Sequence, residues 1–70
     1  MSTVRTAAQE LGRDLKDARK EVGLTQVQLA ELVDLSDRTV RDIEKGAGGV
    51  SLGAVLKVAD ALGLRLEVHR

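Results

Sequence analysis

The sequence feature that most constrains the fold is a very short connection between two segments with helical periodicity. In the first segment the apolar residues fall within 29–33, and in the second Val40 and Ile43 form a narrow apolar seam. The connection is Asp34-Leu35-Ser36, which is too short for parallel packing and predicts two short helices that cross at a steep angle. Ala30 would lie at their closest approach, where a larger side chain would hold the helices apart.

Capping signals predict the boundaries of four helices. Thr6 and Thr25 each precede a glutamine at the spacing of a capping box. Ser36 and Ser51 are typical N-cap residues, and glycines follow three of the four segments, as glycine does at helix ends. The sequence therefore predicts helices within residues 6–23, 25–34, 36–46 and 51–63, with a glycine-rich loop at 46–49.

The C-terminal residues change period. Leu64, Leu66 and Val68 alternate with polar residues, which is typical of a strand. An isolated strand is not stable, and no other strand pattern occurs in the chain. Two interpretations stay open: the same strand of a second copy pairs with it in a homodimer, or the C-terminus frays. We expect the first, with residues 64–69 as a dimerisation strand.

The composition favours an all-α fold. The 70 residues correspond to one domain, with an expected core of residues 6–63. The chain contains no Phe, Trp or Tyr, so its core has to be built from aliphatic side chains, and this favours close helix packing. The expected fold class is a compact four-helix domain with a short C-terminal β-strand.

The composition also argues against several function classes. The chain has no cysteine and a single histidine, His69, near its end, so nucleophile–base pairs and zinc sites lack their parts. We therefore expect no enzyme activity, no metal and no cofactor. No apolar run approaches the ~18 residues of a membrane span, and residues 1–10 lack the apolar stretch of a secretory signal. The absence of cysteine fits a reducing compartment, so we expect a cytoplasmic protein.

Two short helices that cross steeply form a helix-turn-helix, whose second helix enters the major groove of DNA. With Val40 and Ile43 buried, a step of about 100° per residue points the long polar side chains of the second helix outward. Residues near the N-terminus of such a helix contact the bases. Arg38 is therefore the first candidate for a base contact, a bidentate one with guanine.

Other polar residues of this helix are further candidates. Arg41 would contact a base or a phosphate, and Ser36 and Thr39 suit hydrogen bonds to either. Asp37 and Asp42 would accept hydrogen bonds from cytosine amino groups, or would repel phosphates and sharpen specificity. The alternative interpretation is an ordinary solvated helix face, on which the same residue types occur.

The run from Gly23 to Val33, with its Leu-Thr-Gln opening and small Ala30, resembles the Cro/phage-repressor family of helix-turn-helix domains. Residues 35–46, which end in Ile-Glu-Lys-Gly, resemble that family's recognition helix. The resemblance covers about residues 11–63 and implies sequence-specific binding of double-stranded DNA, with repression as the default. The family commonly has glycine at the position of Asp34, but aspartate tolerates a left-handed backbone better than most residues, so we expect the turn to form.

The resemblance also implies roles for individual residues. Gln26 opens a helix whose N-terminal amides would bind a phosphate. Arg19 and Glu44 occupy the positions of an ion pair that holds the first helix to the third in this family. The expected DNA-contacting residues are Gln26, Ser36, Asp37, Arg38, Thr39, Arg41, Asp42 and Lys45.

The compact length and the ending from Gly63 to Val68 are similar to HipB-like antitoxins, a narrower group. That group is found beside a HipA-like kinase toxin and dimerises through its C-terminal strand. This similarity implies an antitoxin that also regulates its own operon. The alternatives are a protein-binding antitoxin that chiefly neutralises a HipA-like kinase, and a stand-alone phage-type repressor.

The formal net charge is zero, which argues against a strongly basic, non-specific nucleic-acid binder. However, Arg13, Lys16 and Lys20 recur at helical spacing on the first helix and predict a basic ridge. We therefore expect weak non-specific binding. A homodimer would bind a palindromic operator, with half-sites about one helical turn apart.

Overall fold

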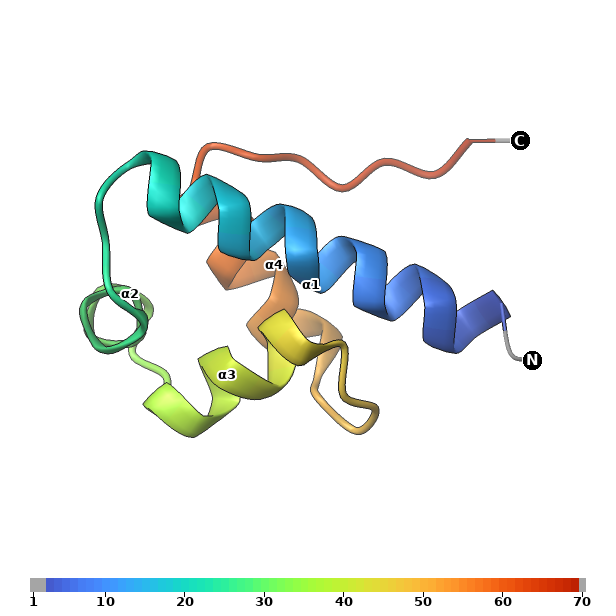
Figure 1. Ribbon diagram of the computed structural model, residues 1–70, viewed down its shortest axis with the longest axis horizontal. Helices are drawn as coiled ribbons and strands as arrows, with labels where there is room; N and C mark the ends of the chain where they lie inside the picture. Colours follow the sequence, from blue (N-terminus) through green and yellow to red (C-terminus); the bar gives the residue numbers. More distant parts are fainter. Residues whose placement is uncertain (1–2, 70) are drawn as a thin grey trace.

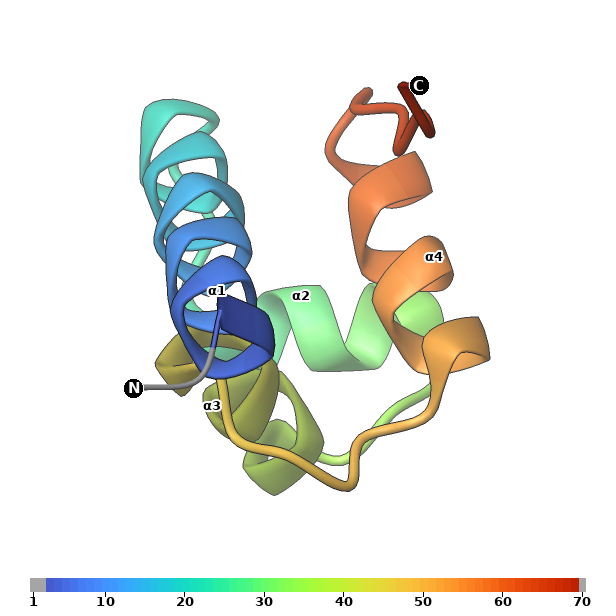
Figure 2. The ribbon, with the colours of Figure 1, turned by 90° about the vertical axis from the view of Figure 1, so that its right-hand side faces the viewer.

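A computed structural model describes residues 3–69. It contains four helices, α1 (Thr3–Glu21), α2 (Gln26–Val33), α3 (Asp37–Lys45) and α4 (Leu52–Ala61). Figure 1 shows α1 as a long rod across the molecule, with α3 below it and the C-terminal tail above. In Figure 2, α1 and α4 stand on opposite sides of the molecule and α2 crosses between them. The predicted all-α, four-helix class is confirmed.

Three of the predicted N-caps are confirmed. The Thr25 hydroxyl accepts a hydrogen bond from the Gln28 N–H at 3.0 Å, and the Gln28 side chain returns one to the Thr25 N–H at 2.9 Å, which completes a capping box. Ser36 and Ser51 cap α3 and α4 through their hydroxyls. The expected start of the first helix at Thr6 is wrong, because α1 already includes Thr3. No glycine or proline separates the two threonines, so nothing interrupts the helix there.

The turn between α2 and α3 depends on a left-handed residue. Asp34 has φ 57° and ψ 46° and is the only non-glycine residue with positive φ among those described. Its conformation reverses the chain, so that the Leu35 N–H donates to the Ala30 carbonyl at 2.9 Å. The expectation that the turn forms with aspartate, where the family commonly has glycine, is confirmed.

The hydrophobic core draws on all four helices. Leu15 of α1, Leu29 of α2, Val40 of α3 and Val58 of α4 are completely buried. Burial of one such aliphatic side chain contributes roughly 1.5–3 kcal/mol, so these residues together hold the four helices in place. Among residues 3–69, no helix is both long enough and apolar enough to cross a membrane.

Gly12 brings α1 and α3 into direct backbone contact. A Cβ atom built at this position would lie 2.6 Å from the Glu44 carbonyl oxygen, closer than such atoms approach in real structures. Because the obstructing atoms belong to the backbone of α3, a larger residue would push the two helices apart. The glycine therefore sets the distance between α1 and α3.

A buried ion pair joins the same two helices. Arg19 of α1 donates from Nε to Glu44 Oε2 at 2.7 Å and from Nη2 to Oε1 at 3.0 Å, and the two side chains are only 9% and 3% exposed. A third nitrogen, Nη1, donates to the Leu24 carbonyl at 2.8 Å. Burial raises the pKa of Glu44, but hydrogen bonds from Arg19 and Gln26 outweigh it and hold that pKa below its ordinary value.

The predicted C-terminal strand is absent from the described chain. Residues 64–69 are extended, but they pair with no other strand among residues 3–69. One hydrogen bond, from the Leu64 N–H to the Ala59 carbonyl at 2.9 Å, ties the start of this tail to the end of α4. The side chains of Leu64 and Leu66 in the tail line a groove together with Leu11 of α1. A strand needs a hydrogen-bonded neighbour, and the single chain does not provide one.

We predict that Glu44→Gln strongly destabilises the fold. The substitution keeps the shape of the side chain but leaves the Arg19 guanidinium buried without its counter-charge. Removing one half of a buried pair costs about 3–5 kcal/mol, a large share of the stability of a small domain. Thermal unfolding followed by circular dichroism measures the loss. Glu31→Gln, the same change at an exposed position, serves as the control and should leave the melting temperature nearly unchanged.

The same variant gives a pH test. Because the pKa of Glu44 is lowered in the folded state, its charged form stabilises the fold above the unfolded pKa near 4.5, and this contribution is lost as the pH falls through the folded pKa. Wild-type stability should therefore fall below about pH 4.5 more steeply than that of Glu44→Gln. Equal slopes in acid for the two proteins would show that Glu44 does not stabilise the fold through its charge.

Candidate nucleic-acid interface

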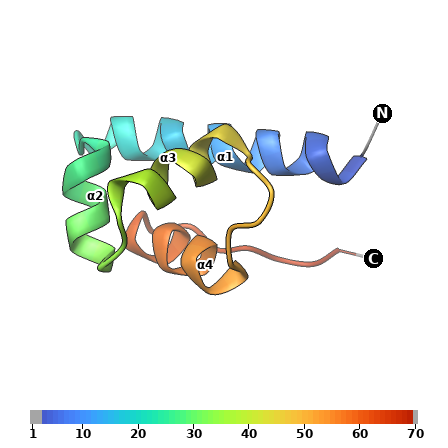
Figure 3. The ribbon, with the colours of Figure 1, turned by 90° about the horizontal axis from the view of Figure 1, so that it is seen from below.

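Helix α3 lies at the surface on one side of the molecule. Seen from below, it lies between α1, α2 and α4, and none of them covers it (Figure 3). Val40 and Ile43 face the core. The other side of the helix carries the polar side chains that the sequence assigned to a DNA-contacting surface.

The two arginines of α3 differ in their surroundings. The Arg41 Nη1 atom lies 3.9 Å from Asp37 Oδ2, one turn earlier, and both side chains are about half exposed. Arg38 is exposed and forms no ion pair within the described part of the chain. The ion pair between Arg41 and Asp37 was not predicted from the sequence, although a spacing of four residues on a helix favours such a pair. Arg38 is thus the arginine of α3 without a carboxylate partner in the described chain, whereas Arg41 is half exposed beside Asp37.

The hydroxyl groups at the start of α3 are engaged with each other. Ser36 Oγ accepts a hydrogen bond from the Thr39 N–H at 3.1 Å and lies 2.8 Å from Thr39 Oγ1. Their first role is therefore to cap the helix. Towards the C-terminus, Asp42 is half-buried and Lys45 is exposed in the last turn, where its charge complements the helix dipole.

Gln26 is tied to α3 rather than free in solvent. Its Nε2 atom donates to Glu44 Oε1 at 3.0 Å, and the side chain is half-buried at the first position of α2. Glu44 thus holds Arg19 and Gln26 at once. The sequence pattern does not indicate this contact, because the two residues are 18 positions apart and meet only through the tertiary fold.

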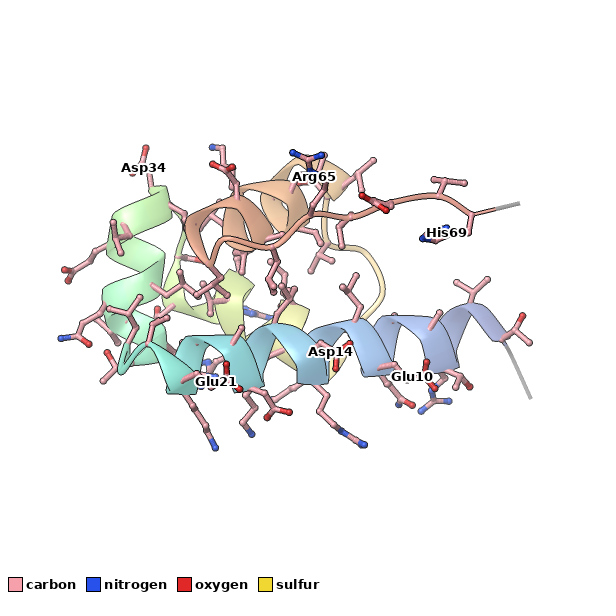
Figure 4. All side chains as sticks on the ribbon, turned by 90° about the horizontal axis from the view of Figure 1, so that it is seen from above. Glu10, Asp14, Glu21, Asp34, Arg65 and His69 are labelled. Atoms are coloured by element: carbon pink, nitrogen blue, oxygen red, sulfur yellow. The ribbon has the colours of Figure 1, made fainter. Side chains whose placement is uncertain are left out.

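Charges of opposite sign lie on different sides of α1. Arg13 and Lys16, two of the three residues of the predicted basic ridge, line a surface groove with Lys45 beside the C-terminal end of α3. Lys20 is exposed but does not line this groove. Asp14 and Glu21 line the other groove, beneath the tail. Figure 4, seen from the tail side, shows acidic residues along α1 and Arg65 across from them on the tail. The zero net charge is therefore compatible with a cationic groove next to α3, while acidic side chains of α1 lie near the tail.

The arrangement combines an exposed helix, a free guanidinium and flanking cations on one side. Such a helix has the dimensions to enter a major groove, and the cations beside it would lie near phosphates. We see no comparable gathering of exposed cations on the tail side of α1, within residues 3–69.

Comparisons with known proteins agree with this geometry. Residues 15–68 match the family model described as helix-turn-helix. The chain is 45% identical over 57 residues to a protein named immunity repressor protein from Bacillus phage phi105, a match that covers 81% of this chain and 40% of the phage protein. It is 43% identical over 49 residues to an uncharacterized HTH-type transcriptional regulator from Methanothermobacter thermautotrophicus, with 70% and 71% of the two chains covered.

The chain thus spans less than half the length of the phage repressor, but most of the archaeal regulator. The matched region includes α2, the turn at Asp34 and α3, which are the elements that form the exposed helix and its support. On this evidence the chain belongs to the helix-turn-helix family of DNA-binding domains.

Proposed function

We propose that the chain is a cytoplasmic, sequence-specific regulator that binds double-stranded DNA with α3 in the major groove and represses transcription, including that of its own gene. The observation that carries this proposal is the exposed face of α3, with Arg38 unpaired and a basic ridge beside it. The two relatives, whose names describe a repressor and a transcriptional regulator, support the same function.

Each contact residue receives a role from its surroundings. Arg38 is assigned to a guanine, because its guanidinium is free and lies near the helix N-terminus. Arg41 is assigned to a phosphate or a neighbouring base, with Asp37 orienting it. One N–H of the Gln26 amide is used by Glu44, which leaves the second free for a phosphate. The remaining polar positions would adjust the fit to the duplex: Ser36, Thr39, Asp42 and Lys45.

We predict that Arg38→Ala loses about 1–3 kcal/mol of affinity for the operator and keeps its fold. The measurement is a titration of labelled DNA from upstream of the gene, against a shuffled duplex and at several salt concentrations. The label belongs on the DNA because the chain has no Trp or Tyr. Glu31→Ala truncates an exposed side chain outside both α3 and the tail and should bind like wild type.

Two outcomes would count against the proposal at different levels. If Arg38→Ala binds the operator as tightly as wild type, then Arg38 does not contact a base. If the wild-type protein shows no preference for the upstream duplex at any salt concentration, sequence-specific DNA binding itself is wrong. Circular dichroism of each variant shows whether lost binding reflects lost folding.

We propose that the regulator acts as a homodimer, and that residues 64–69 pair with the same residues of a second copy. Within the described residues, no backbone hydrogen bond is formed by the tail after the Leu64 N–H. Its backbone is therefore available to an incoming strand. Val68 is 92% exposed, so a partner strand would also cover apolar surface. Two copies related by a two-fold axis would present two α3 helices to a palindromic site.

Hydrogen exchange tests this pairing. We predict that alternate backbone amides within residues 65–68 exchange slowly at high protein concentration and fast on dilution, because pairing between copies protects them. The amides of α4 provide an internal control. Fast exchange of the tail at every concentration would show that it frays.

A second candidate function is that of a HipB-like antitoxin, supported by the similarity of the ending from Gly63 to Val68. In this case the chain also binds a HipA-like kinase. If a kinase-like gene lies beside its own, we predict that the two products, expressed together, elute as one complex in size-exclusion chromatography. Separate elution, with wild-type binding to the upstream DNA, would leave a stand-alone repressor.

A further inference from the structure

Two neighbouring grooves lie along the first turns of α1. One, of about 590 Å³, is formed by residues between Val4 and Gln9 together with the end of α3 and the loop that follows it. The other, of about 340 Å³, lies between α1 and the last two residues of α3. Gln9 and Lys45 line both grooves, which therefore form one continuous surface. Figure 1 shows the first turns of α1 extending past the end of α3.

A backbone contact holds the first turns of α1 against the end of α3. A Cβ atom built at Gly46, the C-cap of α3, would lie 2.6 Å from the Gln9 Cα atom. Any other residue at this position would therefore collide with the backbone of α1. The contact fixes the first turns of α1, and the side chains that they carry, relative to α3.

The surface that these grooves form is cationic. Its only carboxylate, Glu44, is 3% exposed and is occupied by Arg19. Arg13, Lys16 and Lys45 are exposed, and none of them forms an ion pair within residues 3–69. Such a surface favours an anionic ligand. We call it the α1 flank, and its polar residues are Arg5, Gln9, Arg13, Lys16 and Lys45.

The α1 residues of this flank follow a single side of the helix. Arg5, Gln9, Arg13 and Lys16 recur at spacings of three and four, which is the helical period. Residues 5–16 of a helix cover roughly 16 Å, and the phosphates of one DNA strand follow one another about every 3.4 Å along the duplex axis. The α1 flank is therefore long enough to meet more than one phosphate.

The first turns of α1 also precede the region that the chain shares with its family. The family model matches residues 15–68, whereas α1 begins at Thr3. Arg5 and Arg13 thus lie outside the matched region. A ligand contact made by these two arginines would be an addition to the helix-turn-helix domain.

We infer that the α1 flank binds the phosphate backbone of the DNA duplex, beside the base pairs that α3 reads. This inference rests on the proposed function, but adds a contact outside the helix-turn-helix. Lys45 belongs to α3 and lines both grooves, so the flank is continuous with the helix that enters the major groove. Since phosphate contacts carry no sequence information, the flank lengthens the bound DNA without adding to the sequence that is recognised.

Arg5→Gln and Arg13→Gln test the inference, since each removes one cation from the α1 flank. Each should weaken binding to the operator and to the shuffled duplex by the same factor, about threefold or more at low salt. Each should also reduce the slope of log affinity against log salt concentration by about 0.9, the value for one lost phosphate contact. Lys57→Gln, the same change at an exposed position of α4 outside both grooves, should alter neither quantity.

Neutral backbone linkages locate the contact on the DNA. In a set of operator duplexes, a methylphosphonate replaces one phosphate at a time outside the base pairs that α3 reads. At least one of these replacements should weaken binding by wild type and leave binding by Arg13→Gln unchanged, because that variant has already lost the contact. Equal losses for the two proteins at every position would overturn the inference.

The possible outcomes separate this inference from the proposed function. If Arg5→Gln and Arg13→Gln keep the wild-type affinity and salt slope on both duplexes, the α1 flank does not bind DNA, although α3 still does. A loss confined to the operator would assign the two arginines to base recognition and would also overturn the inference. If wild type binds no duplex at any salt concentration, the proposed function itself fails. Circular dichroism of each variant shows whether its fold is intact.

Discussion

The buried contacts of Glu44 connect the elements on which the proposed DNA-contacting surface depends. Its carboxylate accepts two hydrogen bonds from Arg19 of α1 and one from Gln26 of α2, while it belongs itself to α3. Arg19 also holds the Leu24 carbonyl in the connection that leads into α2. An apolar pair of similar volume would stabilise the core equally well or better. The carboxylate, however, accepts three hydrogen bonds through its two oxygens and so orients a guanidinium and an amide at the same time.

This network defines the position of α3 relative to its support. Gly12 allows the backbones of α1 and α3 to touch at Glu44, and the side chain of the same Glu44 pairs with Arg19 further along α1. The turn at Asp34 then sets where α3 begins. These three constraints act on backbone and buried atoms. They therefore do not restrict which residue types occupy the exposed positions of α3. A scaffold of this kind suits a family in which the exposed residues of one helix determine the sequence that is bound.

A neutral chain that binds a polyanion requires its charges to be separated in space. The helical period of α1 achieves this separation, because Arg13 and Lys16 lie on the side shared with α3, while Asp14 and Glu21 lie towards the tail. The basic side would attract phosphates, and the acidic side would disfavour binding in the wrong orientation. Low net charge should keep non-specific affinity weak and leave specificity to the contacts of α3.

The sequence by itself determined the local structure. The caps at Thr25, Ser36 and Ser51 and the left-handed turn at Asp34 involve residues at most a few positions apart, and such short-range hydrogen bonds follow directly from residue type and spacing. The start of α1 was the exception, since a capping pattern does not begin a helix when no glycine or proline interrupts the residues before it.

Only the tertiary structure decided how distant residues meet. The contact between Gln26 and Glu44, the need for Gly12 against α3, and the groove that Leu66 lines together with α1 all join segments far apart in the chain. Periodicity specifies which side of a helix is apolar, but not which helix will cover it. That choice depends on the packing of all four helices at once, which no local pattern contains.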